Sequence, residues 1–218
     1  MGETIGVKIK VLVLEDDPFT RLSLVAALSH FGYDVIIEEA TAGAAVSRAK
    51  TAKPDAAVLD LHLGTGPTGI DVARELRKIN PLVGLVVLTS FDDPRLLNPS
   101  LPPIPSGTVY LTKQSVSNLS ELKAAVQTSL DNKAEGVEVQ HVPAFGTLSD
   151  IQIEALRLVA QGLSNAEIAK RRFIKEKSVE LTISRIAKSL GIESNISANQ
   201  RVHIARVYFR AIGAKVDT

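Results

Sequence analysis

Short apolar runs that alternate with helical patterns constrain the fold of this chain most strongly. Three of these runs contain almost no polar residue: Ile9–Leu14, Ala56–Leu61 and Leu82–Leu88. Such runs are typical of parallel strands that are buried on both faces between layers of helices. Weaker runs at Tyr33–Ile37 and Thr108–Leu111 bring the number of predicted strands to five. The pattern predicts an α/β fold with a doubly wound, parallel five-stranded sheet.

Helical patterns separate these strands, with one exception. Helical spacing of apolar residues follows Pro18 and recurs at Ala42–Ala52, Ile70–Ile79 and Leu119–Leu130. Between the fourth and fifth strands, residues 91–107 contain five prolines. Proline removes backbone donors and disfavours helix in the preceding residue. We therefore expect a Pro-rich loop in place of the fourth helix, with at most one turn around Arg95–Leu97.

The last third of the chain has a different pattern. Residues 131–147 lose the periodicity and contain Gly136, Pro143 and Gly146, which indicates a linker. Two capping boxes then mark helix starts at Ser149 and Ser164. The predicted helices are Ser149–Gln161, Ser164–Arg171, Lys175–Leu190 and Ser197–Ile212. The predicted organisation is a sheet domain at 1–130, a linker at 131–147 and a small all-α domain at 148–218.

The composition excludes several classes of protein. The chain has no Cys, which excludes disulfides, thiolate metal sites and cysteine nucleophiles. Its four His are scattered without metal-ligand spacing, which argues against a zinc site. No apolar run approaches the ~20 residues of a membrane span, and the N-terminus lacks the features of a signal peptide. We therefore expect a cytoplasmic protein without a membrane partner.

Charge is distributed unevenly along the chain. Residues 164–210 contain ten basic and four acidic residues, whereas residues 1–130 contain 12 basic and 14 acidic residues. A basic module behind a near-neutral one indicates a polyanionic partner for the second module. A solvated Lys/Arg-rich helix face would have the same composition.

Polar residues gather at the predicted strand ends. Asp16 and Asp17 follow the first strand, and Asp60 ends the third. Thr89 and Lys113 lie at the ends of the fourth and fifth strands. The carboxyl ends of parallel strands meet at one edge of the sheet, where ligands bind. Clustered carboxylates there favour Mg²⁺, beside which Asp60 could act as a nucleophile toward a phosphoryl group bound by Thr89 and Lys113.

Residues 8–130 resemble the receiver domain of bacterial two-component response regulators. The matching stretches are Leu14-Glu15-Asp16-Asp17, Leu59-Asp60, Leu88-Thr89-Ser90 and Tyr110-Leu111-Thr112-Lys113. The resemblance implies that a sensor histidine kinase phosphorylates Asp60, that Thr89 and Lys113 contact the phosphoryl group, and that Tyr110 is a rotating aromatic switch. It also implies that Mg²⁺ is bound by Asp17, Asp60 and the backbone carbonyl of His62, with Asp16 contributing through a water molecule.

Two features depart from this family pattern. Gly64 stands where a proline is usual, four residues after the phospho-acceptor, and the Pro-rich stretch 91–107 replaces the fourth helix. The fourth helix is part of the face through which many receivers signal. We therefore expect phosphorylation to be intact and the output surface to be remodelled.

Residues 148–212 resemble a LuxR-type helix-turn-helix domain, as found in the NarL/FixJ class of regulators. The matching stretches include Ala160–Ala169, Ser178-Val179 and Leu190-Gly191-Ile192. The resemblance makes Lys175–Leu190 the recognition helix, which would enter the major groove of double-stranded DNA. The candidate DNA-contacting residues are Lys177, Ser178, Glu180, Leu181, Thr182, Arg185 and Lys188.

This recognition helix also departs from the family pattern. Glu180 stands where Lys is usual, Thr182 where His is frequent, and Lys175 where a Ser cap is usual. A glutamate near phosphates is repulsive, although glutamate can accept a hydrogen bond from cytosine. The final helix, Ser197–Ile212, either mediates dimerisation, as the resemblance implies, or packs on the other three helices.

The sequence predicts a transcription regulator rather than an enzyme. In this interpretation a histidine kinase phosphorylates Asp60, and a homodimer then places two recognition helices on DNA. One alternative is a regulator whose second domain binds a protein partner, or binds DNA independently of phosphorylation. Another is an aspartyl-phosphate phosphohydrolase, but such enzymes commonly have a second Asp where His62 stands here.

Overall fold

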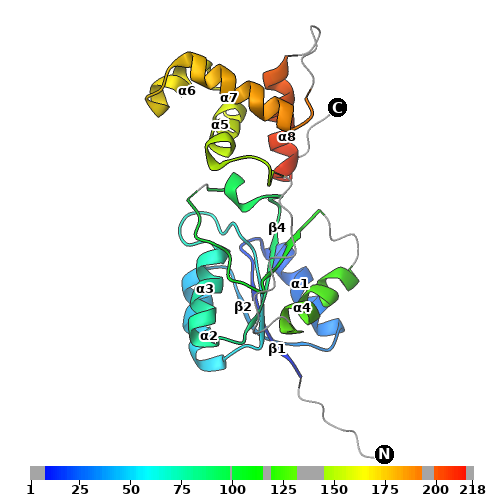
Figure 1. The fold of residues 1–218 in the computed structure, drawn as a ribbon. Coiled ribbons are helices and arrows are strands. Elements are labelled where there is room, and N and C mark those ends of the chain that lie inside the picture. The colour runs from blue at the N-terminus through cyan, green and yellow to red at the C-terminus, as the bar shows by residue number, and fades with distance from the viewer. Residues whose placement is uncertain (1–7, 99, 115–118, 132–144, 193–198, 215–218) are drawn as a thin grey trace, which may run out of the picture. The chain divides into compact units, whose positions relative to one another are not determined.

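The computed structural model describes residues 8–98, 100–114, 119–131, 145–192 and 199–214. The chain divides into two compact units (Figure 1). The sheet unit contains Met1–Thr89 and Pro102–His141, and the helical unit contains Ser90–Leu101 and Val142–Thr218. Residues 90–101 thus belong to the helical unit, whereas the sequence pattern assigned them to the sheet domain. Most of the predicted linker 131–147 lies outside the described residues.

The sheet unit contains five parallel strands in the order β2-β1-β3-β4-β5, which confirms the predicted doubly wound fold. The strands are β1 (Lys10–Leu14), β2 (Asp34–Glu39), β3 (Ala56–Leu59), β4 (Gly84–Thr89) and β5 (Val109–Thr112). Every residue of β3 and β4 is buried, as their continuous apolar runs predicted. Asp60, predicted to end the third strand, is the first residue after it.

Helices cover both faces of the sheet. They are α1 (Pro18–His30), α2 (Ala42–Ala52), α3 (Gly69–Ile79) and α4 (Leu119–Asp131). α1 and α4 lie on one face, and α2 and α3 lie on the other (Figure 1). Side chains of β1 alternate between these layers: Val11 and Val13 pack toward α1 and α4, and Leu12 and Leu14 toward α2 and α3. This burial of both faces explains why the strand sequence is continuously apolar.

The connection between β4 and β5 has no α-helix among its described residues. It contains one 3₁₀ turn, η1 (Pro94–Leu96), where the sequence predicted at most a turn. Asp93 caps this turn by accepting a hydrogen bond from the Arg95 amide at 2.9 Å. The prolines of this segment therefore have the effect expected of them.

The helical unit is built from α5 (Asp150–Ala160), α6 (Asn165–Arg172), α7 (Glu176–Ser189) and α8 (Gln200–Ala211). Both predicted capping boxes are present, at Ser149 and at Ser164. Apolar residues of α7 recur every three or four positions in the sequence, and three of them, Val179, Ile183 and Ile186, form one stripe that is buried in the core. Among the described residues, no helix combines the length and apolar character needed to cross a membrane.

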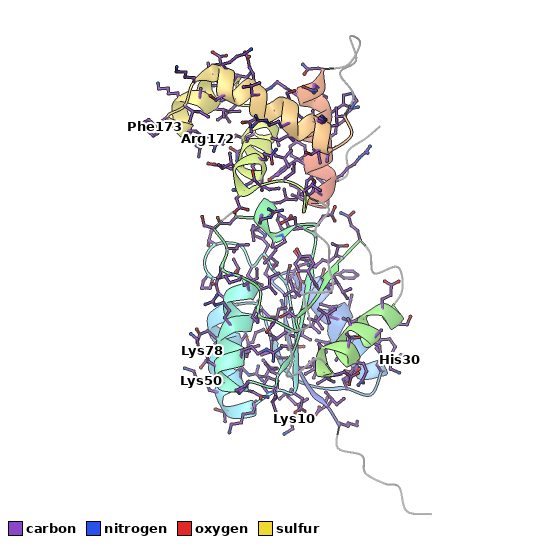
Figure 2. The ribbon with its side chains drawn as sticks, viewed as in Figure 1. Lys10, His30, Lys50, Lys78, Arg172 and Phe173 are labelled. Atoms are coloured by element: carbon purple, nitrogen blue, oxygen red, sulfur yellow. The ribbon has the colours of Figure 1, made fainter. Side chains whose placement is uncertain are left out.

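The turn between α6 and α7 depends on a residue in an unfavourable backbone conformation. Phe173 follows α6 with a φ of 54°, in the left-handed region. Its side chain is 95% exposed and projects from the end of α6 (Figure 2). A bulky residue pays an energetic penalty in this region that Asn and Gly largely avoid.

Phe173→Asn is expected to stabilise the helical unit by about 0.5–1 kcal/mol, because Asn tolerates the left-handed region and the exposed ring contributes little packing. Urea unfolding followed by circular dichroism measures the change. The matched control is Phe19→Asn, at an exposed phenylalanine within α1. A gain of equal size in the control would show that the backbone of Phe173 is not its cause.

Candidate functional site

A lysine joins two buried carboxylates at the carboxyl edge of the sheet. The Lys113 Nζ donates to Glu15 Oε2 at 2.7 Å and to Asp60 Oδ2 at 2.8 Å. Each residue directly follows the last residue of a strand: Glu15 follows β1, Asp60 follows β3 and Lys113 follows β5. Glu15 is 1% exposed and Asp60 is 7% exposed. The strand ends therefore converge as predicted, and the ammonium neutralises part of the carboxylate charge.

Three carboxylates could share one metal ion. One oxygen from each of Glu15, Asp16 and Asp60 lies within 4.8 Å of the other two. Glu15 was absent from the predicted ligand set, although it is the first residue after β1. The sequence contained this signal, because Glu15 and Asp16 are both acidic and both adjoin the strand end.

Asp17, which was predicted to bind the metal, is not one of the three carboxylates in this cluster. Its carboxylate caps α1, accepting a hydrogen bond from the Thr20 amide at 2.7 Å. Hydrogen bonds from Thr20 hold the pKa of Asp17 below its usual value. Pro18 occupies the first helical position, which favours a capping residue directly before it. Asp17 is thus used to start the helix, and Glu15 occupies the place beside Asp60.

Strand pairing holds the remaining predicted residues in place. The Asp60 amide donates to the Leu14 carbonyl at 2.8 Å, and the Lys113 amide donates to the Thr89 carbonyl at 2.6 Å. The side chain of Asp60 accepts from the His62 amide at 3.3 Å. Thr89 is fully buried. The backbone thus positions Asp60, Thr89 and Lys113 at one edge of the sheet.

Tyr110 lies in β5 and is 2% exposed. Its role as a rotating switch, like the metal-binding role of the His62 carbonyl, stays a prediction.

The start of α3 approaches Asp60 too closely for a side chain. A Cβ added to Gly69 would lie 2.1 Å from the Asp60 carbonyl oxygen. The Gly69 amide also donates to the Leu61 carbonyl at 3.1 Å. Gly69 is therefore required for α3 to begin against the backbone of Asp60.

Burial and charge shift the pKa values of this cluster. Burial raises the pKa of Glu15, with a contribution from the nearby Asp60, while the Lys113 hydrogen bond opposes the shift. Burial disfavours the Lys113 ammonium, but Asp60 and Glu15 outweigh that effect and raise the pKa of Lys113. Lys113 therefore stays charged at neutral pH and stabilises both carboxylates.

The predicted DNA-contacting residues all lie on α7, outside its buried stripe. Thr182 is half-buried, and the others are exposed: Lys177, Ser178, Glu180, Leu181, Arg185 and Lys188. Glu180 pairs with Lys177 at 3.0 Å, so one predicted basic contact is partly neutralised within the helix. Lys175 is the N-cap of α7 and makes no side-chain capping bond, as its poor capping chemistry predicted.

Comparisons with known proteins agree with both units. Residues 11–127 match the response regulator receiver domain, and residues 146–206 match the bacterial regulatory proteins of the luxR family. The chain is a response regulator of the NarL/FixJ class. Its receiver domain carries the acidic cluster, and its LuxR-type domain carries the helix-turn-helix.

Relatives and solved structures span both domains. The DNA-binding transcriptional activator DevR/DosR of Mycobacterium tuberculosis is 30% identical and covers 87% of this chain and 92% of its own length. The response regulator protein VraR of Staphylococcus epidermidis is 27% identical and covers 87% and 94%. The solved RcsB–DNA complex has a similar fold, with a TM-score of 0.56, 19% identity and coverage of 94% and 99%.

Lys113→Met is expected to destabilise this response regulator by about 2 kcal/mol at neutral pH, because it leaves two buried carboxylates without their shared ammonium. The pKa of Glu15 is raised in the folded state, so the folded protein binds this proton more tightly than the unfolded chain does. The stability gained from this proton is fully present below the unfolded pKa and is lost as the pH rises through the folded pKa. Removing the ammonium raises that pKa further, so the loss should shrink in acid.

Urea unfolding at about pH 7.5 and about pH 5 measures this dependence. The control is Lys78→Met, at a 68% exposed lysine paired with Glu75 on α3. We expect that variant to lose at most about 0.5 kcal/mol at either pH. A loss for Lys113→Met that stays constant across this range contradicts a charge-based role.

Proposed function

We propose that this response regulator is a transcription factor that a sensor histidine kinase switches by phosphorylating Asp60. The observation that carries the proposal is the Lys113 bridge, which holds a nearly buried Asp60 at the sheet edge. The receiver domain and the LuxR-type domain on one chain support a phosphorylation input and a DNA output.

The proposed transfer moves a phosphoryl group from a phosphohistidine to the carboxylate of Asp60. An Asp60 oxygen forms the new O–P bond as the N–P bond of the phosphohistidine breaks. Lys113 stabilises the charge on the phosphoryl oxygens, and the Thr89 hydroxyl binds one of them. Because the Lys113 ammonium already contacts the Asp60 carboxylate, it can shift to an oxygen of the transferred phosphoryl group with little rearrangement.

The acidic cluster fits Mg²⁺, since its donors are all carboxylate oxygens in reach of one ion. We propose that Glu15, Asp16 and Asp60 hold the ion, together with the backbone carbonyl of His62. When bound, Mg²⁺ neutralises the acidic pocket and polarises the phosphoryl group. The capping role of Asp17 argues against its inclusion in this set.

The DNA output is proposed to act through α7. Its exposed residues would reach base edges and phosphates in the major groove, while the buried stripe keeps α7 on the core. RcsB, which shares the fold, has been solved as dimers bound to DNA. We propose that this chain also binds DNA as a homodimer.

Beryllofluoride, which mimics a phosphoryl group, is expected to increase enrichment of one shared set of genomic DNA fragments by the full-length protein in the presence of Mg²⁺. The Asp60→Asn variant should lose this increase, because it lacks the carboxylate that receives the group. The measurement is a pulldown followed by sequencing, with circular dichroism as the folding control. Equal enrichment in all samples would indicate DNA binding without phosphate control, and no enrichment would indicate a protein partner.

Arg185→Ala is expected to lower affinity for an enriched fragment by about tenfold and to reduce the magnitude of the salt slope by about one. Fluorescence anisotropy over a salt series measures both quantities. Arg74→Ala is the control, since Arg74 is exposed on α3 of the sheet unit. An unchanged salt slope for Arg185→Ala would place the DNA-binding surface away from this part of α7.

A further inference from the structure

A segment from the receiver's β4–β5 connection forms part of the core of the DNA-binding unit. We call residues 91–98 the strap. Leu96, in the strap, is 1% exposed and belongs to the same hydrophobic cluster as Phe145, Leu148 and Leu156. Phe91 packs against the edge of this cluster. The helical unit therefore completes its core with residues that precede it in the chain by about fifty positions.

Arg95 fixes the strap to the start of α5. Its Nη1 donates to the Leu148 carbonyl at 2.8 Å and to Asp150 Oδ1 at 3.2 Å. Its Nη2 donates to the Phe145 carbonyl at 2.9 Å and to Asp93 Oδ2 at 2.8 Å. The Asp93 side chain is fully buried. A guanidinium with this many partners has one favourable position, so it sets where the turn before α5 lies.

The strap also reaches the other end of the helical unit. The Asp92 amide donates to the Ala211 carbonyl at 2.8 Å, and Ala211 is the last residue of α8. α5 and α8 pack against each other within this unit. The strap thus holds the beginning of the first helix and the end of the last one.

The strap begins two residues after Thr89, which ends β4 and lies at the proposed phosphoryl site. The strap contains Pro94 at the first position of η1, and this proline restricts the backbone between Asp93 and Arg95. A restricted segment passes a displacement at one end to its other end instead of absorbing it. From Thr89 the chain reaches Asp92 in three residues, and the hydrogen bond from the Asp92 amide to the Ala211 carbonyl then joins it to the end of α8.

We propose that the strap is the output element of this response regulator, with Arg95 as its positioning residue. A change at Thr89 on phosphorylation of Asp60 is passed through the strap to α5 and α8, in place of a fourth receiver helix. This inference rests on the proposed function, because it requires that Asp60 accept a phosphoryl group and that the helical unit bind DNA.

The test compares the DNA affinity of the full-length protein with and without beryllofluoride, at constant Mg²⁺. We expect a gain of about tenfold for the wild type and for the Arg74→Ala control. For Arg95→Ala the gain should fall below about twofold. Arg95→Lys should behave like Arg95→Ala, because an ammonium cannot reproduce the forked contacts. Fluorine NMR should show beryllofluoride bound to every variant.

A purely structural brace would give a different result. Arg95→Ala would then weaken DNA binding equally in both states and leave the gain at its wild-type value, which overturns the inference. If Arg95→Ala unfolds the helical unit, Asp150→Asn replaces it, because Asp150 is 69% exposed and makes only one of the contacts. Its gain should fall about two- to threefold, and an unchanged gain overturns the inference.

A second measurement separates this inference from the proposed function. Hydrogen exchange of the DNA-free wild type should show that beryllofluoride changes the protection of Leu96 and of the last turn of α8. If beryllofluoride binds and these amides do not change, the strap does not transmit. If fluorine NMR shows no binding to wild type, the proposed phosphorylation itself fails, and the strap then has no signal to carry.

Discussion

The ion pairs of Lys113 with Glu15 and Asp60 are the contacts on which the receiver site depends. Two carboxylates this deeply buried repel each other and lose most of their hydration, and a shared ammonium offsets both costs. The three residues come from the ends of β1, β3 and β5, so the cluster forms only when these strands are paired in register. The proposed chemistry of Asp60 therefore follows from the sheet, and any change of register would remove it.

The helical unit depends on a comparable long-range condition. Its core contains Leu96, and its α5 entry is held by Arg95, although residues 102–141 lie between this segment and the rest of the unit. Both residues belong to a connection that would be a surface helix in the family pattern. In this chain, a strap anchored in the helical unit stands where the family pattern has a helix on the receiver surface. This difference is the basis for a distinct route of signal output in this response regulator.

Local features of the sequence predicted most of the fold because they act within a few residues. Continuous apolar runs identified β3 and β4. The capping boxes at Ser149 and Ser164 identified the starts of α5 and α6. The candidate site was less predictable, because three acidic residues in a row follow β1. Which of them faces Asp60 depends on where α1 begins, and Pro18 sets that point by making Asp17 the cap.

The sequence by itself determined the two kinds of unit, the doubly wound sheet, the apolar stripe of α7 and the edge at which Asp60 lies. Only the tertiary structure decided that Glu15 joins Asp60 and that Gly69 must lack a side chain. It alone also assigned residues 90–101 to the helical unit. The physical reason is distance along the chain: the Arg95–Leu148 hydrogen bond joins residues 53 positions apart. Periodicity and capping describe neighbours, whereas such contacts exist only once separate segments have packed.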